Sequence, residues 1–133
     1  MLSRTKKRRK FKDSFKNCID GLRFININED NFKREILLGI IALVLSYLLK
    51  IDKIEFIIII IVIGLVLVSE IINTAIERLV DLVSPKYNKL AGEVKDIAAS
   101  SVLLMCIFSL VVGVIIYFSV DKQRRVDQSL LLI

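Results

Sequence analysis

The segment "FIIIIIVIGLVLVSEIINTAIERLVD", residues 56–81, joins an apolar run to a row of polar side chains on what we expect to be one helix. No charged residue occurs between Phe56 and Val68. The residues that follow include a row of polar side chains at helical spacing: Glu70, Asn73, Glu77 and Asp81. At 100° per residue they fall at about 0°, 300°, 340° and 20°, so they share an arc of roughly 80° on the helix surface.

A carboxylate that faces lipid is costly, so this polar face is expected to point into protein or into a polar cavity. The alternative is a polar seam that holds helices together. Three carboxylates on one face disfavour that alternative, because like charges repel. Counted from Phe56, Glu70 lies about 21 Å along the helix and Glu77 about 31 Å. The row therefore descends from lipid depth to the membrane surface, which suits a reaction between a membrane substrate and a soluble one.

The composition is typical of a small integral membrane protein with soluble ends. The chain has 133 residues, of which 55% are hydrophobic and 26% charged, and we read it as one domain, 1–133. The basic start is not followed by the apolar region of a signal peptide. Cys18 and Cys106 have neither metal-binding spacing nor an expected disulfide. The sequence has no histidine, so a general base must be a carboxylate or, less readily, lysine or tyrosine.

Three transmembrane helices are predicted, over residues 36–51, 54–83 and 97–120, the second with a cytoplasmic extension. A span needs about 20 helical residues, and Ile97–Val120 passes that test alone. The first run is short and needs a flanking segment or a locally thinner bilayer. The turn "KIDK", residues 50–53, joins the first two spans. The second helix should end before Pro85.

The distribution of basic residues predicts the orientation. Residues 1–35 and the connection 77–96 carry 15 of the 20 Lys and Arg residues, so the N-terminus is expected in the cytoplasm of a multi-pass plasma-membrane protein. Apolar residues recur at helical spacing in this first segment: Phe11, Phe15, Cys18, Leu22 and Ile25. The pattern predicts a helix on an anionic cytoplasmic membrane surface. A basic topology signal without a further role is the alternative.

A second polar group is expected at the same cytoplasmic level. Lys95 and Asp96 open the third span, although a pair at the interface is the alternative for them. Glu29 lies before the first span, where the alternative is a helix N-terminal charge with Asp30 or Asn31 as N-cap. Carboxylates, a lysine and an asparagine are the side chains that Mg-nucleotide chemistry uses. The five glycines are scattered, so no soluble-type phosphate-binding loop is present.

Two stretches, "EIINTAIERLVD" and "YNKLAGEVKDIAASSVLL", closely resemble the signature region of the prokaryotic diacylglycerol kinase family, whose Gram-positive branch contains undecaprenol kinases. "SFKNCIDGLR" followed by "NEDNF" resembles the N-terminal region of the family. The resemblance covers about residues 10–120. Its core motif, E-x-x-N-[ST]-A-x-E with a downstream K-D-x-[AG]-[AS], is highly specific.

The resemblance implies an all-α membrane protein: a homotrimer of subunits, each with an N-terminal amphipathic surface helix and three transmembrane helices, and composite active sites. It implies transfer of the γ-phosphate of MgATP to a lipid hydroxyl. Glu70 then matches the catalytic base, with Asn73 beside it. Glu29 and Glu77 match the carboxylates that hold Mg²⁺ with the ATP phosphates. The implied nucleotide contacts are these two carboxylates and Lys10, Asn17, Lys86, Tyr87, Asn88, Lys95 and Asp96.

The sequence departs from the family pattern at Asn17, where an aromatic residue is common, and at Asp20. "INTAIE" and "KDIAASSVLL" resemble the undecaprenol-using branch, which makes undecaprenol the expected substrate. "LAGEVKD" resembles the diacylglycerol-using branch, so a diacylglycerol kinase that makes phosphatidic acid is the alternative. A pore or assembly factor is the alternative of another class. No charged residue lies inside the apolar runs 56–69 and 97–120, which disfavours a pore, and no nucleic-acid partner is expected.

Overall fold

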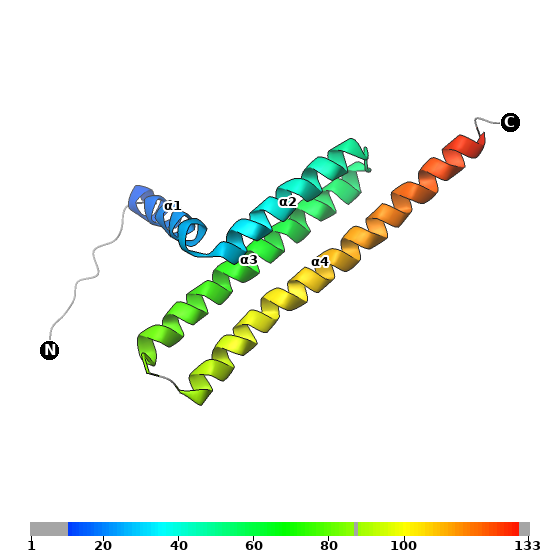
Figure 1. Cartoon of the computed structure of the whole chain (residues 1–133). Helices are drawn as coiled ribbons and strands as arrows, with labels where there is room; N and C mark the ends of the chain where they lie inside the picture. Colours follow the sequence, from blue (N-terminus) through cyan, green and yellow to red (C-terminus); the bar gives the residue numbers. More distant parts are fainter. Residues whose placement is uncertain (1–10, 87, 131–133) are drawn as a thin grey trace.

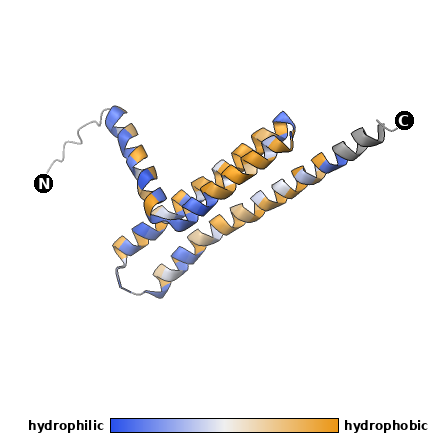
Figure 2. Cartoon of the chain, turned by 45° about the horizontal axis from the view of Figure 1, so that its top comes forward, coloured by the Kyte–Doolittle hydropathy of each residue, from blue (hydrophilic) through white to orange (hydrophobic). Residues whose placement is uncertain are grey.

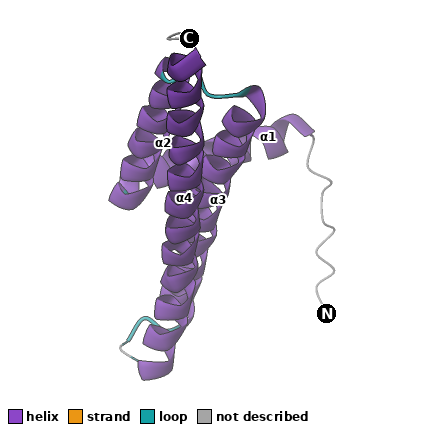
Figure 3. Cartoon of the chain, turned by 90° about the vertical axis from the view of Figure 1, so that its right-hand side faces the viewer, coloured by secondary structure: helices purple, strands orange, loops and turns teal. Residues whose placement is uncertain are grey.

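The computed structural model describes residues 11–86 and 88–130, with side chains up to residue 122. This part of the chain is helical and contains no strand. Its helices are α1 (Phe11–Asn28), α2 (Asp30–Leu48), α3 (Lys53–Val83) and α4 (Lys89–Leu130). Helices α2, α3 and α4 run side by side, and α1 turns away at the start of α2 (Figure 1, Figure 3). The predicted all-helical fold is confirmed.

Both ends of α3 are set by local sequence. The carboxylate of Asp52 accepts a hydrogen bond from the backbone N–H of Ile54 at 3.2 Å, and the Asp52 N–H donates to Glu55 Oε2 at 3.4 Å. This reciprocal capping box fixes the first turn. At the other end Ser84 is the C-cap residue, directly before Pro85. The helix therefore ends where the proline was expected to end it.

The start of α2 differs from the alternative in which Asp30 or Asn31 is its N-cap. The N-cap residue is Glu29, and its side chain makes no capping hydrogen bond. It turns instead to Arg78 on α3. Asp30 is the first helical residue and accepts a hydrogen bond from Lys33 Nζ at 2.8 Å. That bond holds the pKa of the Asp30 carboxyl below its usual value.

Helix α3 lies between its two neighbours and packs against both α2 and α4. The contact with α2 is close at Gly39, where an added Cβ would lie 2.9 Å from Cγ2 of Ile63. Glycine permits this approach because it has no side chain.

Burial in the single chain is the inverse of that in a soluble protein. The buried apolar residues in the part with described side chains are Phe32, Ala98 and Ile116. The buried polar residues are more numerous: Ser46, Ser69, Glu70, Asn73 and Thr74. Hydrophobic residues predominate along most of α2 and α3 and in the middle of α4, whereas hydrophilic ones are frequent on α1 and near the α3–α4 connection (Figure 2). Many of the large hydrophobic side chains are exposed in the single chain. This outer surface suits lipid or other membrane-embedded chains.

Within the described residues, two helical segments are long and apolar enough to cross a membrane: Lys53–Val83 and Lys89–Lys122. Only 6% and 11% of their apolar windows are buried, unlike the core helices of a soluble protein. Helix α2 has 19 residues, but its first six include four charged ones, which leaves 13 uncharged residues in 36–48. The chain is a membrane protein by these features, and the count of three spans stays a prediction.

The close contact at Gly39 can be tested against a second glycine. Gly39→Ala and Gly113→Ala gain the same helix propensity, but only the first places a methyl group against another side chain. We expect Gly39→Ala to be less stable than Gly113→Ala by about 1–3 kcal/mol, the usual cost of overpacking. The measurement is loss of helical circular dichroism during unfolding in mixed micelles. Equal stability of the two variants would contradict the close packing of α2 on α3.

Candidate active site

The polar row on α3 passes from buried to exposed along the helix. Glu70 is 4% exposed and Asn73 is 7% exposed. Glu77 is half-buried, and Asp81 is exposed. Thr74 is buried beside the first two. In the single chain, the burial of Glu70 and Asn73 agrees with the expected inward-facing arc.

Asn73 orients one carboxylate of the row and keeps a free acceptor. Its Nδ2 donates a hydrogen bond to Glu77 Oε1 at 3.0 Å, one helical turn away. Its Oδ1 is buried and has no hydrogen-bond partner in the described part of the chain. A buried oxygen without a donor favours binding of a cation or of a ligand hydroxyl. The amide therefore lies beside the candidate carboxylates, and its role in the site stays a prediction.

Glu29 reaches this row from the junction of α1 and α2. Its Oε1 accepts a hydrogen bond from Arg78 Nη2 at 2.9 Å. Glu29 and Glu77 both lie near enough to Glu70 for their charges to act on it. The fold thus brings together three predicted carboxylates from positions 29, 70 and 77. The sequence analysis assigned no role to Arg78, because its partner lies 49 residues away.

Glu35 is a further carboxylate at the site that the sequence analysis missed. It lies on α2, half-buried, and close enough to Glu70 for their charges to interact. Its Oε2 is buried and has no hydrogen-bond partner among the described residues. The available signal was its position, directly before the apolar run that begins at Ile36.

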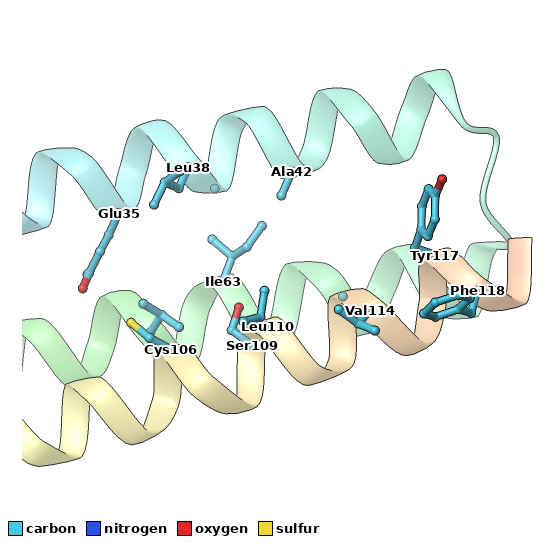
Figure 4. A pocket seen from close by; sticks show the side chains of 13 residues that line it. Glu35, Leu38, Ala42, Ile63, Cys106, Ser109, Leu110, Val114, Tyr117 and Phe118 are labelled. Atoms are coloured by element: carbon cyan, nitrogen blue, oxygen red, sulfur yellow. The ribbon is translucent and has the colours of Figure 1, made fainter. Parts of the chain in front are cut away.

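An apolar pocket of about 470 Å³ lies between α2, α3 and α4, and of these carboxylates Glu35 is the one that lines it. Glu35 points into it at one end, and Tyr117 and Phe118 lie at the other (Figure 4). Val66, one turn before Glu70, forms part of its wall. The pocket can hold a hydrocarbon chain whose polar end reaches the carboxylates.

A second, more polar pocket of about 250 Å³ lies at the α3–α4 connection. Its lining includes Asp81, Lys86, Asn88 and Lys95. Lys95 of α4 forms an ion pair with Asp81 of α3, and not with its neighbour Asp96. Three of the predicted nucleotide contacts, at 86, 88 and 95, therefore share one pocket.

The other predicted nucleotide contacts are not gathered there. Asn17 is exposed on α1, and Asp96 is exposed on α4 outside the lining of this pocket. Lys10 and Tyr87 lie outside the described residues. Asn88 has a local task as well, because its Oδ1 accepts a hydrogen bond from the Leu90 N–H at 2.9 Å near the start of α4.

The donor set fits a divalent cation that arrives with phosphates. No group of three or more His, Cys, Asp or Glu side chains able to hold a metal occurs among the described residues. Glu29, Glu77 and the unpartnered Oδ1 of Asn73 offer oxygen ligands, which Mg²⁺ prefers. Mg²⁺ usually takes one or two carboxylates and completes its shell with phosphate oxygens and water. The residues therefore fit Mg-nucleotide better than a free metal ion.

Comparison with known proteins agrees with this chemistry. The family model described as "Prokaryotic diacylglycerol kinase" matches residues 16–117. "Diacylglycerol kinase" of Escherichia coli (strain K12) is 34% identical over 99 residues, 74% of this chain and 81% of that protein. "Undecaprenol kinase" of Bacillus subtilis (strain 168) is 33% identical over 108 residues, 81% of this chain and 88% of that protein. The chain therefore belongs to the prokaryotic diacylglycerol kinase family and is a phosphotransferase that acts on a hydroxyl group.

Proposed function

We propose that this enzyme transfers the γ-phosphate of ATP to the hydroxyl of undecaprenol at the cytoplasmic side of the plasma membrane. The observation that carries the proposal is the placement of Glu70. This carboxylate is buried one helical turn beyond Val66, which forms part of the wall of the apolar pocket, and it begins a row of polar groups that becomes exposed toward the α3–α4 connection. A lipid hydroxyl and a water-soluble phosphate donor can meet there. Membership of a kinase family sets aside the pore and the assembly factor.

In the proposed reaction Glu70 is the general base. Its carboxylate accepts the proton of the lipid hydroxyl while the lipid oxygen forms a bond to the γ-phosphorus. The bond from that phosphorus to the β–γ bridging oxygen breaks, and ADP leaves. Asn73 keeps Glu77 in place through its hydrogen bond. The products are a lipid phosphate and ADP.

Glu29 and Glu77 would hold Mg²⁺ together with the ATP phosphates. The metal, when bound, neutralises charge on the phosphates during transfer. The pocket at the α3–α4 connection would hold the nucleotide, with Lys86, Asn88 and Lys95 as its contacts. The roles of Lys10, Asn17, Tyr87 and Asp96 in nucleotide binding are carried by the family resemblance alone.

The proposed assembly is a homotrimer of three-span subunits with a cytoplasmic N-terminus. Two features of the single chain support an assembly. Its three long helices leave most of their large apolar residues exposed. Glu77 is only half-buried in the single chain, so a neighbouring subunit could complete the walls of the site. The charge distribution of the sequence supports the orientation.

The apolar pocket supports undecaprenol as the substrate, with diacylglycerol as the alternative. Its wall is formed mainly by residues such as Leu38, Ile63, Leu110 and Val114. A polyprenol places only hydrocarbon against such a wall. A diacylglycerol also brings two ester carbonyls, which cost about 1–3 kcal/mol each if they are left unpaired.

We expect Glu70→Gln to slow phosphate transfer by at least about 100-fold while nucleotide binding is retained, because the variant keeps its shape and loses the base. Glu93→Gln is the matched control, since Glu93 is exposed and its ion pair with Lys89 is long, at 3.9 Å. The assay follows labelled phosphate from ATP into extracted lipid. Near-normal turnover of Glu70→Gln would remove Glu70 from the role of base.

If Glu29 and Glu77 share one Mg²⁺, Glu29→Gln and Glu77→Gln should each raise the Mg²⁺ concentration needed for half-maximal activity. The double variant should lose much less than the sum of the two single losses, because the two residues act as a unit. Asp30→Asn is the control, since this neighbouring carboxylate pairs with Lys33. Fully additive losses would mean that the two carboxylates serve separate sites.

We expect kcat/KM for undecaprenol to exceed that for diacylglycerol by about tenfold or more, since about 1.4 kcal/mol of unpaired ester corresponds to one decade. The two lipids are offered in parallel to purified protein with MgATP, in the same bilayer composition. Equal or better use of diacylglycerol would replace the proposed substrate with the alternative.

A further inference from the structure

Arg78 contacts Glu29, one of the two proposed metal ligands, but is not itself a proposed ligand of the metal or the nucleotide. Its Nη2 donates to Glu29 Oε1 at 2.9 Å, and its guanidinium carbon lies 5.1 Å from the centre of the Phe24 ring. The side chains of Arg78 and Glu29 are 55% and 24% exposed. Arg78 therefore joins α3 to the end of α1 and to the junction before α2.

The pair changes the charge of the site when no ligand is present. Three carboxylates, Glu29, Glu35 and Glu77, lie near enough to Glu70 for their charges to interact with it. Arg78 is the one cation with an ion pair to any of them in the described part of the chain. A metal ion that arrives without nucleotide must compete with this guanidinium for Glu29. Removal of the positive charge should therefore favour a free divalent cation.

Phosphates would reverse this balance. A guanidinium carries five N–H donors, and a single hydrogen bond from Arg78 is found among the described residues. Arginine binds phosphate oxygens through paired, charge-assisted hydrogen bonds. The contact with the Phe24 ring would keep the guanidinium carbon near the site while the N–H donors exchange Glu29 for phosphate oxygens.

We propose that Arg78 is an exchangeable counter-ion, which binds Glu29 in the nucleotide-free enzyme and the ATP phosphates once metal has taken Glu29. The site thereby accepts the metal together with the nucleotide rather than the metal alone. This inference rests on the proposed function, because it needs Glu29 to be a ligand of the nucleotide-bound metal. Arg78 thereby determines whether the site binds the metal ion alone or the complex of metal and nucleotide.

The test measures two affinities in Arg78→Gln and Arg78→Lys. Paramagnetic resonance follows binding of Mn²⁺ alone, and calorimetry follows binding of a non-hydrolysable ATP analogue with Mg²⁺. For Arg78→Gln we expect Mn²⁺ alone to bind about tenfold more tightly and the nucleotide about tenfold more weakly, the scale of one charge-assisted hydrogen bond. Arg78→Lys keeps the charge but loses the paired donors, so it should restore the wild-type Mn²⁺ affinity and only part of the nucleotide affinity. Lys33→Gln, which breaks the exposed pair with Asp30, should change neither.

A rise in Mn²⁺ affinity together with a fall in nucleotide affinity distinguishes this role from a purely structural one. A parallel fall of both affinities in Arg78→Gln, or no change in either, would overturn the inference while leaving the kinase proposal in place. A wild-type enzyme that binds no Mg-nucleotide analogue would overturn the proposed function, and the role of Arg78 with it.

Discussion

The constraint on which the rest of the structure depends is the burial of one carboxylate, Glu70, directly after the long apolar run of α3. A charge at this depth is tolerated only where protein surrounds it. Ser69, Asn73 and Thr74 are buried on the same stretch of α3, so polar side chains accompany this carboxylate in the interior. The apolar residues, by contrast, lie mostly outside. In the part of the chain with described side chains, more polar residues than apolar residues are therefore buried.

A single helix carries the path from lipid to water. Along α3 the polar row runs from the buried Glu70 to the exposed Asp81, and two ion pairs toward its exposed end connect this helix to other elements. Arg78 connects it to Glu29 before α2, and Asp81 connects it to Lys95 of α4. These two pairs attach the candidate metal ligand Glu29 and the candidate nucleotide contact Lys95 to α3. The wall of the apolar pocket includes Val66, one turn before the buried end of the row, which supports the proposal that the lipid and the nucleotide approach from different phases.

Local features could be read from the sequence, and contacts between distant segments could not. The helical period predicted which residues of α3 share one face, and Pro85 predicted where that helix ends. The pairing of Glu29 with Arg78 was missed, because periodicity within one helix does not show which residue of another helix faces it. The same holds for Lys95, which pairs with Asp81 and not with Asp96. Glu35 was missed because a charge at the edge of an apolar run looks like an ordinary boundary of a span.

The most direct test of the proposed site detects whether the lipid hydroxyl and the metal bind close to each other in one complex. Mn²⁺ in place of Mg²⁺, a non-hydrolysable ATP analogue and undecaprenol carrying ¹³C at its hydroxyl carbon can be bound together in a bilayer. Reacting atoms in a competent complex lie about 3–3.5 Å apart, so the labelled carbon should be close to the metal that bridges the phosphates. The account predicts a ¹³C hyperfine coupling to Mn²⁺ in electron–nuclear double resonance. No coupling, with both ligands shown to be bound, would contradict it.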